Sequence, residues 1–120
     1  MSDHLFSWGT TFPFDISVTL SGAAVNLTGK KLILKAKHRK SDLDADAEIS
    51  MSTESGEGIV VTNAAGGIAR ATITPAMVAD LPAGKETRLY YDVRLIDGSN
   101  PYVVASGKFR VLPVVVRALT

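Results

Sequence analysis

The 120-residue sequence contains no cysteine, and this absence removes several classes of protein at once. Disulfide scaffolds, thiolate zinc sites, iron–sulfur clusters and cysteine nucleophiles all need the missing side chain. The fold must therefore depend on the packing of its apolar side chains, which make up 46% of the chain. The length suits one compact domain.

The sequence also lacks an excess of charge and a long apolar run. Thirteen Lys and Arg against twelve Asp and Glu leave a net charge of +1. Such a balance gives no large field toward nucleic acid or an anionic membrane. No stretch approaches the roughly 20 apolar residues of a membrane span, and Asp3 stands where a secretory signal needs a positive residue. We therefore expect a soluble cytosolic product with no nucleic-acid partner and no membrane partner.

Histidine is scarce, and its two positions carry no motif of a catalytic site. A catalytic triad needs a histidine within hydrogen-bond reach of a nucleophile and a carboxylate. His4 has no such setting, and His38 stands among basic residues, which indicates a surface position. No G-x-S-x-G elbow surrounds a serine. We expect no catalytic residues and hence no enzyme.

Two charged segments resemble ligand sites but are explained more simply. Residues 42–46 have the D-x-D-x-D opening of a calcium loop, yet Ala47 and Thr53 stand where that loop needs Gly and Glu. We therefore expect an acidic turn with neither metal nor other cofactor. Lys35, Lys37 and residues 39–40 form a basic stripe without neighbouring aromatics in the sequence. This pattern predicts an edge strand protected by lysines.

The apolar residues that are present recur with a period of two, which is typical of strands with one buried face. The expected strands cover residues 14–20, 25–27, 31–38, 47–52, 59–62, 68–73, 89–95 and 103–111. One helical signal covers 75–81, where Thr74 is the expected N-cap and Pro75 the first helical residue. Short strands without repeated crossover helices predict an all-β, antiparallel sandwich of seven or eight strands with one short helix.

The alternation also predicts which side chains form the core. In the strand 89–95 the odd-numbered residues are apolar and the even-numbered ones are mostly polar. The same reasoning across the chain selects Ile16, Val18, Leu32, Leu34, Ile49, Ile73, Leu89, Tyr91, Val93, Phe109 and Val111.

A series of local sequences matches a known family in order along the chain. The landmarks are Asp15-Ile16-Ser17-Val18-Thr19-Leu20, Ala24-Val25-Asn26-Leu27-Thr28-Gly29, Gly58-Ile59-Val60-Val61, Ala65-Gly66-Gly67, Ala71-Thr72-Ile73-Thr74-Pro75, Leu81-Pro82-Ala83-Gly84, Tyr90-Tyr91-Asp92-Val93-Arg94-Leu95 and Gly107-Lys108-Phe109-Arg110-Val111. From Phe12 to Arg117 the chain resembles the immunoglobulin-like N-terminal domain of phage baseplate upper proteins and related short prophage tail proteins.

This resemblance implies an immunoglobulin-like β-sandwich and a structural role. The expected protein is a non-enzymatic component of a phage or prophage particle, in its tail or baseplate, made in the bacterial host cytoplasm. It would form a homo-oligomer and contact other phage structural proteins. The alternative is a carbohydrate-binding or adhesin-like module, in which Tyr90 and Tyr102 would stack on sugar rings.

Half of the eight aromatic residues fall in the first 14 positions. We expect residues 1–11 to form an aromatic N-terminal arm and residues 12–117 to form the sandwich domain. Leu5, Phe6, Trp8 and Phe12 are the candidate protein-interface residues, since large aromatic side chains contribute strongly to interfaces. The arm either folds back on its own sandwich as an edge strand or crosses to another subunit. Gly9 and Pro13, a flexible and a rigid point on either side of Thr10-Thr11, favour the crossing.

Overall fold

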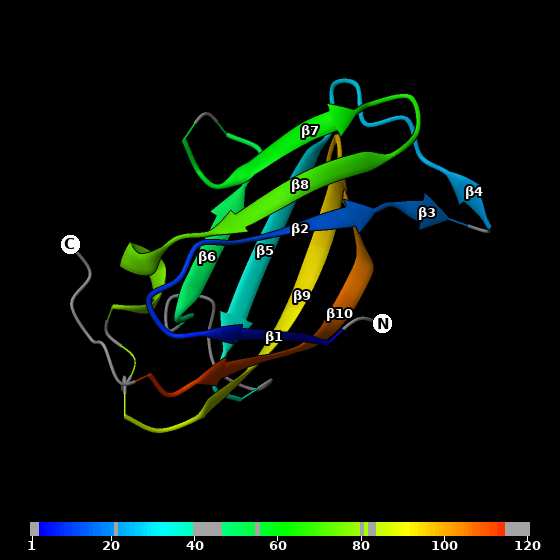
Figure 1. The fold of residues 1–120 in the computed structure, drawn as a ribbon. Coiled ribbons are helices and arrows are strands. Elements are labelled where there is room, and N and C mark those ends of the chain that lie inside the picture. Colours follow the sequence, from blue (N-terminus) through cyan, green and yellow to red (C-terminus); the bar gives the residue numbers. More distant parts are fainter. Residues whose placement is uncertain are drawn as a thin grey trace.

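The structure is a computed structural model that describes residues 3–20, 22–39, 47–54, 56–79, 81 and 84–114. It contains a five-stranded sheet, a three-stranded sheet and a two-stranded hairpin within these residues (Figure 1). The strands are β1 His4–Ser7, β2 Phe12–Ser17, β3 Thr19–Leu20, β4 Ala23–Ala24, β5 Lys31–Lys37, β6 Ile49–Ser52, β7 Ile59–Asn63, β8 Ile68–Ile73, β9 Thr87–Asp97 and β10 Asn100–Leu112. The all-β class predicted from the sequence is therefore confirmed.

The large sheet has the order β1-β10-β9-β5-β6 and is strongly curled. Its centre is the long hairpin of β9 and β10, which turns at Gly98 with a φ of +65°. Along β9 the side chains alternate between the core and the outer surface, because successive residues of a strand point to opposite faces. The large sheet therefore has one apolar inner face and one polar outer face.

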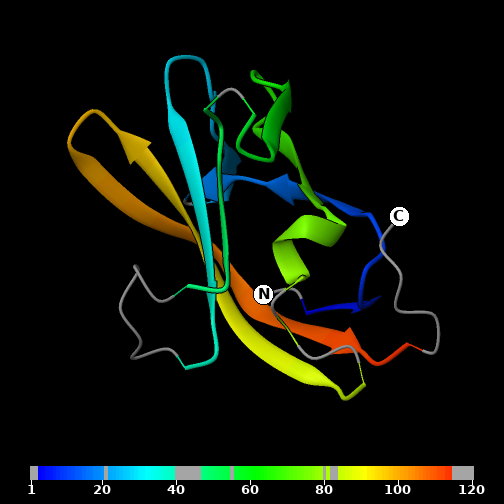
Figure 2. The same ribbon diagram turned by 90° about the vertical axis from the view of Figure 1, so that its left-hand side faces the viewer.

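The small sheet has the order β2-β8-β7 and faces the inner side of the large sheet (Figure 2). The β3–β4 hairpin continues from β2 and is joined to the β7–β8 turn at Gly67. Gly67 accepts a hydrogen bond from Val18 N at 2.7 Å and has a φ of +70°. A Cβ there would lie 2.7 Å from Val18 O and 2.8 Å from Val25 O, so only glycine fits without displacement.

Both sheets contribute to one core. All eleven residues that the alternation selected are buried, from Ile16 on β2 to Val111 on β10. Val93 and Leu34 are fully buried and lie opposite each other on neighbouring strands. The core prediction is therefore confirmed.

The expected helix is shorter and of a different type. Among the described residues of this segment, Pro75–Val78 forms a helix, and it is a 3-10 helix. Its hydrogen bonds span three residues, from Met77 N to Thr74 O at 3.1 Å and from Ala79 N to Ala76 O at 3.4 Å. Thr74 is the N-cap residue and Pro75 the first helical residue, as predicted, but the Thr74 side chain makes no capping hydrogen bond. The segment is too short to gain from the four-residue bonding of an α-helix.

The sheet topology corrects two further predictions. β1 pairs with β10 in parallel, so the pairing is not wholly antiparallel. β5 lies between β9 and β6, so Lys35 and Lys37 of the basic stripe belong to an interior strand and not to an edge. Strand order depends on contacts between distant segments, which the local lysine pattern does not report. The number of strands among the described residues also exceeds the expected seven or eight.

A β-bulge changes the face of Val103. Val103 lies opposite Arg94, whereas Ala105 lies opposite Val93, so Val104 is an extra residue in β10. One extra residue reverses the side on which the preceding residues point. Val103 is consequently 57% exposed and does not share the inner face of Phe109, although an uninterrupted alternation through the expected strand 103–111 would place both residues on one face. The irregularity of β10 therefore lies at Val104.

Candidate functional site

The outer face of the large sheet collects polar and charged side chains from three neighbouring strands. Lys35 on β5 lies opposite Asp92 on β9, which in turn lies opposite Ser106 on β10. One step along the sheet, Lys37 lies opposite Tyr90. Directly paired residues point to the same face, so these side chains form adjacent rows.

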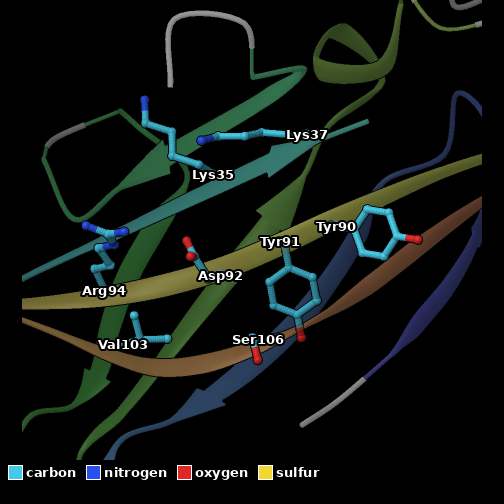
Figure 3. Close-up of a pocket in the computed structure, with 8 residues that line it drawn as sticks. All are labelled: Lys35, Lys37, Tyr90, Tyr91, Asp92, Arg94, Val103 and Ser106. Atoms are coloured by element: carbon cyan, nitrogen blue, oxygen red, sulfur yellow. The ribbon is translucent and has the colours of Figure 1, made fainter. Parts of the chain in front are cut away.

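A hollow of about 220 Å³ lies over these rows (Figure 3). Its lining is mostly polar and comes from β5, β9 and β10. The residues that line it are Lys35, Lys37, Tyr90, Tyr91, Asp92, Arg94, Val103 and Ser106. We call this the outer hollow.

The outer hollow carries an excess of positive charge. Lys35, Lys37 and Arg94 face one carboxylate, that of Asp92, which gives 3 − 1 = +2 among the lining side chains. Lys35 Nζ donates a hydrogen bond to Ser50 Oγ at 3.0 Å. Arg94 and Asp92 form no ion pair within the part of the chain that the structure describes. Their charges are therefore not compensated by a direct partner there.

Tyr90 places an aromatic ring beside the lysine stripe. The ammonium group of Lys108, on β10, lies 5.6 Å from the centroid of the Tyr90 ring, within the range of a cation–π contact. The sequence indicated no aromatic near the stripe, because Tyr90 is more than fifty positions away from Lys37. Pairing of β5 with β9 brings the two together. The sequence missed this site for that reason.

The size and chemistry of the outer hollow suit the binding of a small group. Ligand pockets for drug-sized molecules commonly measure about 300–1,000 Å³, so the outer hollow is smaller than these. Its lysines and arginine can bind an anion, and the Asp92 carboxylate and the Ser106 hydroxyl can accept hydrogen bonds. Within the described ranges, no three His, Asp or Glu side chains gather in a way that could hold a metal ion.

The structure places two of the four candidate interface residues in the core of the same chain. Phe6 and Trp8 are 5% and 7% exposed. Trp8 Nε1 donates hydrogen bonds to Val78 O at 2.9 Å and to Leu81 O at 3.0 Å, at the 3-10 helix. β1 thus lies on its own sheet, as in the fold-back alternative. In this arrangement residues 3–11 share the core of the domain expected for residues 12–117.

The other two candidates are more accessible. Leu5 is 52% exposed and points away from the core on β1. Phe12 is half-buried, and its ring stacks on that of Phe6 with centroids 5.2 Å apart. Of the four residues, Leu5 and part of Phe12 therefore face the surface of this chain.

His4 lies in an aromatic cluster that the sequence did not indicate. Its ring centroid is 4.4 Å from that of Phe14, 5.8 Å from that of Phe109 and 5.9 Å from that of Tyr91. Burial lowers the pKa of His4 below its ordinary value of 6.5, and the charge of Asp3 opposes this shift. Burial also raises the pKa of Tyr91. The two sheets and β1 converge at this cluster.

Three other predicted features have different outcomes. His38 is on the surface, as expected, with Nε2 3.2 Å from Glu48 Oε1. The acidic turn at 42–46 lies outside the described residues. Tyr102 lies opposite the buried Leu95 and therefore points to the inner side of the large sheet, whereas Tyr90 points to the outer side. The two tyrosines do not form one platform.

Comparison with known proteins found no relative of this chain. No protein-family model matches the sequence, and no curated protein matches it. None of the described helical residues forms a segment long and apolar enough to cross a membrane. The functional proposals below therefore depend on the resemblance of the local sequences and on the geometry.

Proposed function

We propose that this protein is a non-enzymatic structural component of a phage or prophage particle, in its tail or baseplate, and that it acts through subunit packing. In this proposal it is made in the bacterial host cytoplasm and resides in the virion. It forms a homo-oligomer and contacts other phage structural proteins. The proposal also treats the two packed sheets as a variant of the immunoglobulin-like sandwich, with β1 as an added parallel edge strand.

The observation that supports this proposal best is the exposure of apolar side chains at the sheet margins. Val60 on β7 is 66% exposed, and β7 lies at one end of the small sheet. Leu5 on the edge strand β1 is 52% exposed. Free strand edges offer backbone groups for pairing with another chain, and proteins that remain monomeric usually protect them. A particle subunit uses such edges when neighbours cover them.

The distal half of β10 provides a further open margin. β1 pairs only with Phe109 to Leu112, so β10 is flanked on one side alone from Asn100 to Lys108 within the described chain. Tyr102 and Val103, in this half, are 42% and 57% exposed. Packing through these margins requires no movement of the arm, whose Phe6 and Trp8 remain in the core.

The proposal is tested by particle composition and by oligomer formation. We expect the chain, tagged and expressed from a prophage, to be recovered in purified particles and in their tail fraction. We also expect the purified protein to exceed monomer mass in light scattering, and Val60→Lys to reduce that mass. Thr62→Lys, on the same strand but replacing an exposed polar residue, is the matched control. Absence from particles would reject the proposal.

A second candidate, a carbohydrate-binding module, is favoured by one observation. Tyr90 forms part of a small polar hollow together with Asp92 and Arg94. Aromatic rings beside hydrogen-bonding groups are common in ligand sites. Binding to a glycan array that is lost in Tyr90→Ala would support this candidate, and an array without any binding would count against it.

A further inference from the structure

The outer hollow combines cations, one carboxylate, one hydroxyl and an aromatic ring in a small volume on the outer face of the large sheet. We propose that it binds a single acidic sugar residue, a sugar ring that carries a carboxylate, within an anionic polysaccharide. This inference rests on the carbohydrate-binding candidate and is independent of the particle proposal.

The cations select an acidic ligand. Arg94 has no ion pair within the described chain, and Lys35 contacts the neutral hydroxyl of Ser50. A guanidinium group can hold a carboxylate through two parallel hydrogen bonds, and this geometry makes arginine effective in carboxylate recognition. With the net charge of +2 in the lining, a carboxylate in the outer hollow would be attracted more strongly than a neutral group.

The Asp92 carboxylate, at the centre of the outer hollow, favours a ligand that carries hydroxyl groups beside its own carboxylate. Asp92 alternates with Tyr90 and Arg94 along β9, so it lies between the aromatic ring and the guanidinium group on the outer face (Figure 3). An ionised carboxylate accepts hydrogen bonds from sugar hydroxyls and repels any anionic group, so the ligand's carboxylate would lie at Arg94 and its hydroxyl groups at Asp92. A phosphate backbone would need a continuous track of cations, which Asp92 interrupts. The arrangement therefore favours an acidic sugar over nucleic acid.

The single ring of Tyr90 and the volume of the outer hollow limit the site to one sugar residue. Single-stranded nucleic acids stack successive bases on several aromatics, whereas the side chains around the outer hollow include only Tyr90 on the outer face. Lys108 contacts the Tyr90 ring and thereby supports its position. A volume of about 220 Å³ suits one ring and leaves a longer chain to extend over the surface.

The test is calorimetric titration of the full chain with oligosaccharides that contain glucuronate, galacturonate or sialate. Neutral oligosaccharides and oligodeoxythymidine serve as comparison ligands. We expect binding of at least one acidic oligosaccharide that weakens about tenfold or more in Arg94→Gln, Lys35→Gln and Tyr90→Ala. Arg70→Gln, which makes the same charge change on the small sheet, should leave the affinity unchanged. Thermal denaturation checks that each variant is folded, and the two charge variants keep the test valid if Tyr90→Ala does not fold.

Each other outcome overturns the inference in a recognisable way. Failure of all the acidic oligosaccharides rejects the acidic sugar. Equal affinity for neutral oligosaccharides rejects the role of the cations but retains the carbohydrate-binding candidate. Binding of oligodeoxythymidine that depends on Arg94 and Tyr90 would identify the outer hollow as a nucleic-acid site. An equal loss of affinity in Arg70→Gln would show that net charge alone determines binding.

Discussion

Removal of the Trp8 side chain tests whether the N-terminal segment packs on the sheet of its own chain. Trp8 is buried and connects the end of β1 to the 3-10 helix through two hydrogen bonds. Trp8→Ala removes both bonds and leaves a cavity, and such substitutions cost about 3–5 kcal/mol. With roughly 4 °C per kcal/mol for a chain of this size, the melting temperature should fall by about 12–20 °C.

Trp8→Phe separates the hydrogen bonds from the packing. The ring remains, but the donor is lost. Val78 O keeps a partner, because it also accepts a hydrogen bond from Leu81 N at 2.9 Å. Leu81 O loses its donor, and one unsatisfied buried carbonyl costs about 1–3 kcal/mol. The melting temperature of this variant should therefore lie between those of the wild type and Trp8→Ala.

The assay can also distinguish an intrachain strand from an exchanged arm. Trp8 is the only tryptophan, so the fluorescence of the unmodified chain reports the unfolding of this segment directly. Assembly through the sheet margins would itself couple unfolding to dissociation, so the titration is made at concentrations where light scattering shows a monomer. If the segment lies on its own sheet, the midpoint of urea unfolding should be independent of protein concentration in that range. An exchanged arm couples unfolding to dissociation, so its midpoint would rise with concentration. Such a rise, or an unchanged melting temperature in Trp8→Ala, would refute the intrachain placement.

Two further predictions concern a turn and the pH dependence of stability. Gly67→Ala should lower the melting temperature far more than Gly98→Ala. Both glycines have a positive φ, but only a Cβ at Gly67 would meet backbone oxygens. Equal losses of melting temperature in the two variants would contradict this account. Because the pKa of folded His4 is lowered, protonation favours the unfolded state, and stability should fall as the pH decreases below the unfolded value of about 6.5. His4→Gln should remove this decrease in urea titrations between neutral and mildly acidic pH, and an identical pH profile in His4→Gln would contradict the assignment.

The inner face of the fold could be predicted from the sequence because it depends on a local rule. A period of two assigns each residue of a strand to one of two faces, and burial follows for the apolar set. Leu34, Val93 and Phe109 were selected in this way and are fully buried. The rule fails where the chain inserts a residue, as at Val104, because the alternation then changes its phase.

The partners of each strand could not be predicted by the same rule. The lysines of β5 are compatible with an edge position, but the strand is interior because it pairs with β6 on one side and makes its long contact with β9 on the other. The same contact brings Tyr90 beside Lys37 and creates the outer hollow. The parallel pairing of β1 with β10 joins segments about one hundred residues apart. These features depend on long-range pairing, which has no local signal in a single sequence.

The alternation along β9 separates the residues that stabilise the fold from those available for binding. Tyr91 and Val93 point into the core, whereas Tyr90, Asp92 and Arg94 point to the outer face. Truncation of inner side chains should cost about 2–5 kcal/mol, while substitutions on the outer face should change stability by about 0.5 kcal/mol or less. Substitutions of Tyr90, Asp92 or Arg94 in the outer hollow could therefore occur without loss of the fold. A surface with this freedom can acquire a ligand while the edges of the same sheets serve in assembly.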